Sequence, residues 1–97
     1  MALKPEKPPR APAYEAPAVQ KAFELLAIVA DSAEGVGVSE LSTALGYSKG
    51  TVHGLVQALL KAGALDQSTQ RKKLFLGPAL VELAFKSRSY RRTIQQA

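Results

Sequence analysis

Few residues of this 97-residue chain could carry out chemistry. There is one histidine, His53, and no cysteine, so a metal site would need His53 together with carboxylates that no nearby cluster supplies. The sequence also contains no Gly-rich phosphate-binding loop and no spacing typical of a Ser–His–Asp triad. We therefore expect no enzymatic activity, no metal ion and no cofactor.

Positive charge is concentrated in the second half of the chain. Residues 1–48 contain four basic and six acidic side chains, a balance of −2, whereas residues 49–97 contain nine basic and two acidic side chains, a balance of +7. Clustered positive charge attracts a polyanion because binding releases the counterions of the polyanion. An ordinary solvated surface is the alternative. The basic residues form two clusters: Arg71, Lys72 and Lys73, and then Lys86, Arg88, Arg91 and Arg92.

The stretch between Ser48 and Gly63 has the pattern of a helix with a bare polar face. Ser48 and Gly63 are of the types that begin and end helices, and the residues between them that repeat at steps of three and four are apolar. Those residues are Val52, Leu55, Val56, Leu59 and Leu60. The opposite face suits entry into the major groove of double-stranded DNA, where Gln can bind adenine and Lys can bind guanine or phosphate. The candidate residues on that face are Lys49, Gly50, Thr51, His53, Gly54 and Gln57.

Two further helices are predicted before this segment. A first helix begins at Pro17 and ends in the loop 31–35. Gly37 and Glu40 have the spacing of a capping box, so a second helix is predicted to begin there and to end at Gly46. Helices joined by so short a turn cross at a steep angle, as in a helix-turn-helix. The predicted buried stripe of the first helix comprises Val19, Ala22, Phe23, Leu26, Val29 and Ala30.

After Gly63 the pattern changes from helical to extended. Segments 64–67 and 73–76 are short enough to be strands, and the polar stretch between them contains the first basic cluster, which predicts a β-hairpin with a basic tip. Pro78 then begins a last helix. The predicted fold is mainly α with a small β-hairpin: a winged helix-turn-helix, made of a three-helix core plus a wing, followed by a linker helix. In such a fold Arg71, Lys72 and Lys73 would contact the DNA backbone.

The composition of the chain also suggests where its domain begins and ends. Residues 1–17 contain five of the six prolines, and we expect them to form a disordered tail. Residues 18–78 are the predicted DNA-binding domain, with the helix-turn-helix at about 38–57 and the wing at about 64–77. Residues 79–97 are predicted to be a linker and dimerisation helix that is truncated before any effector domain.

Three stretches, VQKAFELL (19–26), GVSELSTALGYSKGTVHGLV (37–56) and LGPALVEL (76–83), resemble the N-terminal DNA-binding domain of IclR-type bacterial transcription regulators. The resemblance implies a cytoplasmic, nucleoid-associated protein that binds a palindromic operator as a dimer or tetramer. It also implies that a small-molecule effector acts only through a domain absent from this chain. The sequence departs from the family pattern at three positions, where the family usually has Pro, Ser and Arg: Ser48, Gly50 and Gly54.

Several of these residues have a structural alternative to DNA binding. Ser48 and Thr51 could donate to phosphate or cap the helix, and Ser39 could contact the sugar–phosphate backbone or be an ordinary first-turn serine. Gly54 stands where the resemblance leads us to expect an arginine, so one cation is missing from this face. Gly50 and Gly54, four residues apart, would however let the helix backbone approach DNA closely. The alternative is that the operator contacts lie elsewhere on the same face, at Lys49, His53 and Gln57.

More apolar residues are present than a three-helix core needs to bury. We expect the excess to pair with a second copy of the chain, since a homodimer matches the symmetry of a palindromic site. A winged helix that binds protein instead of DNA is the alternative function, because residues 18–85 hold six basic and six acidic groups. No apolar run is long enough to span a bilayer, and no membrane association is expected. The expected dimerisation residues are Leu25, Ile28, Val81 and Phe85.

Overall fold

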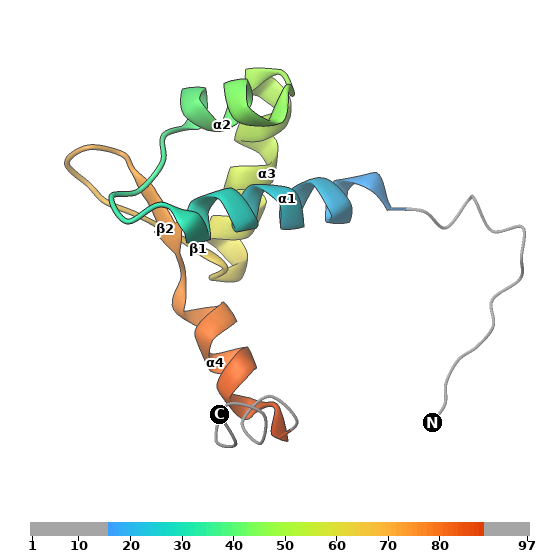
Figure 1. The fold of residues 1–97 in the computed structure, drawn as a ribbon, viewed down its shortest axis with the longest axis vertical. Helices are drawn as coiled ribbons and strands as arrows, with labels where there is room; N and C mark the ends of the chain where they lie inside the picture. Colours follow the sequence, from blue (N-terminus) through green and yellow to red (C-terminus); the bar gives the residue numbers. More distant parts are fainter. Residues whose placement is uncertain (1–15, 89–97) are drawn as a thin grey trace, which may run out of the picture.

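The chain forms three helices, a hairpin and a fourth helix, in that order (Figure 1). The computed structural model describes residues 16–88, so the predicted tail up to residue 15, together with Arg91 and Arg92, lies outside the described residues. The architecture confirms the predicted winged helix-turn-helix. Its elements are α1 (Pro17–Asp31), α2 (Val38–Leu45), α3 (Lys49–Ala62), β1 (Leu65–Gln67), β2 (Leu74–Leu76) and α4 (Pro78–Lys86).

A small set of aliphatic side chains holds the first three helices and the hairpin together. Leu25 of α1, Leu41 of α2, Val52 of α3 and Leu74 of β2 are all completely buried. Burying one such side chain contributes about 1.5–3 kcal/mol. Because each element supplies one of these residues, none of the four can cover its apolar face without the others.

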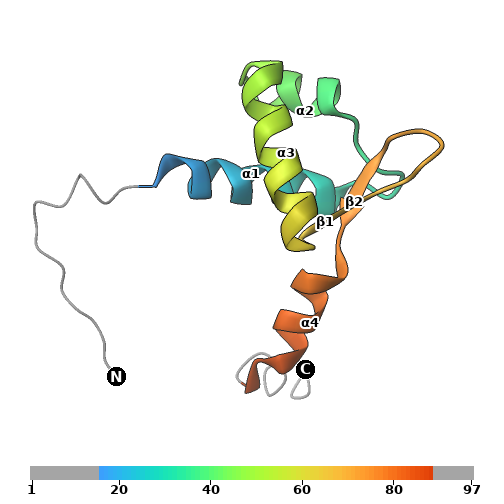
Figure 2. The same ribbon diagram turned by 180° about the vertical axis from the view of Figure 1, so that it is seen from behind.

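The predicted buried stripe of α1 is wrong at its beginning and at its last residue, Ala30, which is exposed. Val19 and Phe23 are 56% and 65% exposed, whereas Leu25 is completely buried and Ile28 packs against the core. The first turns of α1 extend beyond the rest of the domain (Figures 1 and 2), and no other described element covers them. Leu25 is therefore a core residue that no second copy could contact, which corrects its prediction as a dimerisation residue, whereas Ile28 is only partly buried.

The fourth helix extends away from the core (Figures 1 and 2). None of the residues of α4 is buried, and Leu80 is the one that packs against the core cluster. Val81 and Phe85 are 50% and 54% exposed. Across residues 16–88, no helix combines the length and the apolar character needed to cross a membrane.

The two-stranded hairpin also forms an isolated β-bridge that the sequence pattern does not predict. β1 and β2 are antiparallel, with Leu65 opposite Leu76 and Gln67 opposite Leu74. On the other edge of β2, Val36 exchanges two backbone hydrogen bonds with Leu74, with N···O distances of 3.1 and 2.8 Å. The bridge attaches the start of β2, next to the hairpin loop, to the loop that precedes α2.

A close backbone contact fixes the end of the hairpin against the end of α3. The Gly77 N–H donates to the Ala64 carbonyl at 2.8 Å, and the Ala79 N–H donates to the Gly63 carbonyl at 3.0 Å. A Cβ at Gly77 would lie 2.2 Å from the Gly63 carbonyl oxygen, so the contact requires glycine. The start of α4 is thereby held beside the C-terminus of α3.

The turn between α2 and α3 is tied to α1 by a tyrosine. Gly46 ends α2 in the left-handed conformation, at φ 76°. The next residue, Tyr47, donates its hydroxyl to Glu24 Oε1 at 2.5 Å, and Lys21 Nζ lies 4.9 Å from the centre of its ring. The hydrogen bond to Glu24 raises the pKa of the Tyr47 hydroxyl, because it stabilises the protonated form. The start of α3 is thus anchored to the body of the domain.

The exposure of α1 residues leads to a stability prediction. Leu25→Ala is expected to lower the free energy of unfolding by about 2–5 kcal/mol, because it leaves a cavity in the core. Phe23→Ala, at an exposed position, is expected to change it by less than about 0.5 kcal/mol. Urea denaturation followed by circular dichroism measures both values. Equal losses in the two variants would contradict the assignment of the buried face of α1.

Candidate nucleic-acid interface

The helix α3 is buried on one side and open to solvent on the other. Val52 and Val56 are 0% and 1% exposed, and three leucines of the same helix pack partly against the core. All of the groove-facing residues predicted from the sequence are on the exposed side: Lys49, Gly50, Thr51, His53, Gly54 and Gln57. A cylinder with one free polar side is the shape that enters a major groove.

The beginning of α3 is capped by a hydroxyl pair. The Thr51 N–H donates to Ser48 Oγ at 3.1 Å, and Ser48 Oγ donates to Thr51 Oγ1 at 3.0 Å. The capping role predicted for Ser48 is therefore confirmed. The other free N–H groups of the first turn still point outward from the positive end of the helix dipole, where an anion is stabilised.

No added Cβ would clash with the protein at either glycine on the free face of α3. A Cβ at Gly54 would have no neighbour within 4 Å, and one at Gly50 would come no closer than 4.0 Å, to Ser48 Oγ. Packing inside the domain therefore does not require glycine at these positions. Each glycine costs about 0.5–1 kcal/mol relative to alanine in a helix.

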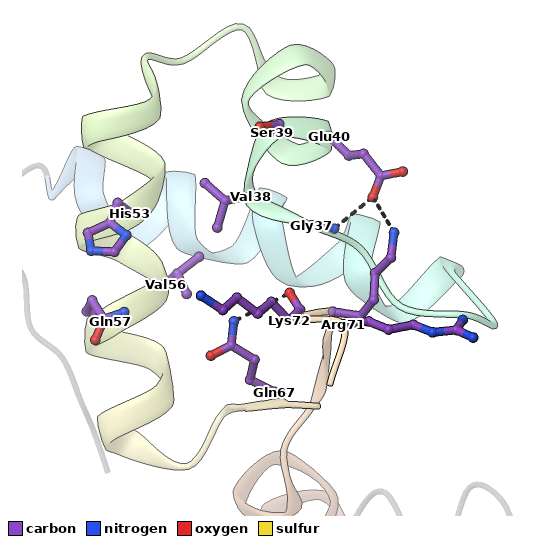
Figure 3. A pocket seen from close by; sticks show the side chains of 11 residues that line it. Gly37, Val38, Ser39, Glu40, His53, Val56, Gln57, Gln67, Arg71 and Lys72 are labelled. Carbon is purple, nitrogen blue, oxygen red and sulfur yellow. Dashed lines mark hydrogen bonds and ion pairs between the residues drawn. The ribbon is translucent and has the colours of Figure 1, made fainter. Parts of the chain in front are cut away.

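Part of the free face of α3 borders an open hollow of about 620 Å³ (Figure 3). The hollow lies between α3, the first turn of α2 and the tip of the hairpin. Seven of the lining residues have side chains that could donate to nucleic acid: Ser39, His53, Gln57, Gln67, Arg71, Lys72 and Lys73. The structure thus brings together predicted residues from three elements, while Lys49, Gly50, Thr51 and Gly54 are not among those that line the hollow.

The hairpin tip directs its two foremost cations differently. The loop closes through hydrogen bonds from the Ser68 N–H to the Lys73 carbonyl at 2.9 Å and from the Lys72 N–H to the Ser68 carbonyl at 3.1 Å. Lys72 has a φ of 57°, a left-handed conformation that is uncommon for a residue with a Cβ. In Figure 3 the Lys72 side chain is directed toward α3, whereas the Arg71 side chain is directed away from it.

Lys73, the third cation of this cluster, forms an ion pair. Its Nζ lies 3.3 Å from Glu40 Oε1, and the same carboxylate oxygen accepts the Gly37 N–H at 2.7 Å (Figure 3). The Gly37 N–H, and after it Lys73, lowers the pKa of the Glu40 carboxyl. The cap spacing identifies Glu40 from the sequence as a capping residue. Its pairing with a residue 33 positions away has no sequence signal.

In the part of the chain that the structure describes, no three His, Cys, Asp or Glu side chains are grouped as they would be around a metal ion. His53 is exposed on α3 and lies beside Gln57 at the hollow (Figure 3). An imidazole can hydrogen bond through both of its ring nitrogens, which suits contacts with base edges. The chemistry that this surface supports is recognition by hydrogen bonds and charge.

Comparison with known proteins supports this interpretation. HTH-type transcriptional regulator XynR of Escherichia coli (strain K12) is 33% identical over 64 residues, which are 66% of this chain and 25% of that protein. Glycerol operon regulatory protein of Streptomyces coelicolor is 29% identical over 65 residues, which are 67% of this chain and 26% of that protein. The chain therefore spans about a quarter of the length of these relatives.

Solved structures show the same relationship. Repressor BlcR of Agobacterium tumefaciens superposes with a TM-score of 0.66 and 27% identity, over 73% of this chain and 28% of that protein. A putative IclR transcriptional regulator from a Silicibacter species superposes with a TM-score of 0.65 and 32% identity, over 70% of this chain and 27% of that protein.

A sequence profile places the relationship on specific elements. The profile of the IclR helix-turn-helix domain matches residues 18–69, more than half of the chain. The matched region runs from α1 through the turn and α3 into the first strand of the hairpin, and it includes the whole free face of α3. The relatives described above are named as regulators. One of the two solved structures is named as a repressor and the other as a putative transcriptional regulator. This chain belongs to the IclR helix-turn-helix domain family.

Proposed function

We propose that this chain is the DNA-binding module of a bacterial transcription regulator and binds double-stranded DNA in a sequence-specific way. The observation that carries the proposal is the free polar face of α3, which lies next to a hairpin tip that presents Arg71 and Lys72. The names of the relatives support the same function. In this proposal a small-molecule effector acts through a part of the whole protein outside this chain.

The residues have distinct roles in the proposed complex. α3 occupies the major groove, where His53 and Gln57 bind base edges and Lys49 binds guanine or phosphate. The hydroxyls of Ser39 and Thr51 donate to the DNA backbone. Arg71 and Lys72 neutralise phosphates beside the groove, which contributes affinity without sequence preference.

A salt titration with two variants tests this division of roles. Lys72→Gln is expected to weaken binding to every sequence and to reduce the slope of log K against log salt by about 0.9, because one phosphate contact is lost. Gln57→Ala is expected to leave that slope unchanged and to cost about 1–3 kcal/mol on the preferred sequence alone. Fluorescence anisotropy with a selected and a scrambled duplex measures both effects.

Lys61→Gln, on α3 but outside the hollow, is the matched control and is expected to bind like the unaltered chain. Equal losses on all sequences for Gln57→Ala would place Gln57 at the DNA backbone. Absence of binding to any duplex at low salt would contradict the proposed function and would favour a winged helix that binds protein.

The glycines of α3 generate a second prediction. Gly54→Ala is expected to raise the free energy of unfolding by about 0.5–1 kcal/mol, because an unopposed methyl group improves the helix. The same methyl group is expected to weaken DNA binding, because it separates the helix backbone from the groove. Thermal unfolding and anisotropy measure the two effects.

Gly46→Ala is the control for this pair of measurements. A Cβ there would also meet nothing within 4 Å, but φ is 76°, so the substitution is expected to cost about 1–2 kcal/mol of stability. A Gly54→Ala variant that is more stable and binds DNA with undiminished affinity would show that the backbone of α3 does not approach the groove closely.

We further propose that the chain acts as a homodimer on a palindromic operator. The exposed apolar residues of α4, Val81 and Phe85, support this, as does Phe23 on the first turns of α1. Two copies related by a twofold axis would place two α3 helices on two half-sites about one helical turn of DNA apart. Leu25, which is completely buried in the core, takes no part.

Sedimentation velocity tests the proposed dimer. Val81→Asp is expected to shift the chain from dimer to monomer, because it introduces a charge into the apolar surface of the interface. Gln70→Asp introduces the same charge at the wing tip and is expected to leave the dimer intact. A sedimentation coefficient that is monomeric for the unaltered chain at high concentration would contradict the dimer.

A further inference from the structure

One acidic side chain lies on the surface that the proposed function turns toward DNA. Glu40 is the one carboxylate among the residues that line the hollow described above, and its side chain is 62% exposed. It is next to Ser39 on the first turn of α2, where phosphate would approach. A free carboxylate there would repel the polyanion.

Glu40 also has a structural role, as a hydrogen-bond acceptor in the first turn of α2. Gly37 is the N-cap residue of α2, and its own N–H donates to Glu40 Oε1 at 2.7 Å, which is one half of a capping box. This hydrogen bond lowers the pKa of the Glu40 carboxyl, and Glu40 therefore stays ionised at neutral pH. The negative charge is a consequence of how the short helix begins.

Lys73 differs from its two basic neighbours in how its side chain is placed. Its Nζ lies 3.3 Å from Glu40 Oε1, and its side chain is only 34% exposed. The start of that side chain lies against Gly35, where an added Cβ would be 2.7 Å from Lys73 Cβ. Among residues 16–88, the structure records no ion pair for Arg71 or Lys72. Figure 3 shows the side chains of both residues extending from the tip of the hairpin.

We infer that Lys73 is a positioning residue that neutralises Glu40 on the DNA-facing surface, and that Arg71 and Lys72 make the phosphate contacts of this basic cluster. The inference rests on the proposed function. Lys73 then improves DNA binding without itself releasing a counterion. A direct phosphate contact by Lys73, which its place at the hairpin tip suggests from the sequence, makes the opposite prediction about salt.

A double-mutant cycle separates the two roles. Lys73→Met is expected to weaken binding to every duplex by about threefold to tenfold, because it leaves Glu40 uncompensated beside phosphate. Glu40→Gln keeps an oxygen that accepts the Gly37 N–H but removes the charge. The double variant Glu40→Gln/Lys73→Met is therefore expected to bind within about twofold of the unaltered chain and to keep its full slope of log K against log salt.

Lys72→Met is the matched control. It is expected to reduce the salt slope by about 0.9, and Glu40→Gln is expected not to restore that slope. If the double variant at 40 and 73 binds as weakly as Lys73→Met and its slope falls by about 0.9, Lys73 contacts phosphate and the inference is overturned. An unaltered chain that binds no duplex at low salt would overturn the proposed function as well, so the two failures are distinguishable.

A measurement without DNA completes the test. In a carboxyl NMR titration, Lys73→Met is expected to raise the pKa of Glu40 while leaving it below its ordinary value, because the Gly37 N–H still donates. Thermal unfolding of the variants is expected to change little, since exposed ion pairs contribute little to stability. An unchanged Glu40 pKa in Lys73→Met would show that the pair does not form in solution and would overturn the inference.

Discussion

The burial of the apolar side of α3 determines which of its residues face the solvent. Val52 and Val56 are buried in the same core cluster as Leu25 and Leu41, and the 3.6-residue period of the helix then turns the polar side of α3 outward. The core is small, so each of these contacts also sets the angle between helices. A change that rotated α3 by one position would replace His53 and Gln57 on the free side by apolar residues.

The turn before α3 makes that orientation rigid. Gly46 reverses the chain in a conformation that other residues adopt only with strain, and Ser48 caps the next helix immediately afterwards. Between them, Tyr47 donates to Glu24 of α1 and accepts a backbone hydrogen bond from Ser42 Oγ at 2.6 Å through its carbonyl oxygen. The start of α3 is therefore tied to α1 through the side chain of Tyr47.

The sequence predicts the elements whose ends carry their own signals. The caps at Gly37, Ser48 and Gly63 predict α2 and α3 because a cap acts within one turn of the chain. The buried face of α1 is not predictable in this way, because the first turns of α1 have apolar residues that no other element covers. The bridge between Val36 and Leu74 and the pair of Glu40 with Lys73 join residues more than 30 positions apart, and a single contact leaves no periodic pattern.

The tip of the hairpin has a lysine, Lys72, in a backbone conformation that favours glycine. A residue with a Cβ in the left-handed conformation costs about 1–2 kcal/mol, and glycine would remove that cost at position 72. Glycine would also remove the ammonium group that Lys72 directs toward α3, while Arg71 is directed away (Figure 3). At the residue with this backbone conformation, two consecutive cations leave the loop in different directions. The tip therefore presents one positive charge on the side of α3 and another on the side that faces away from α3.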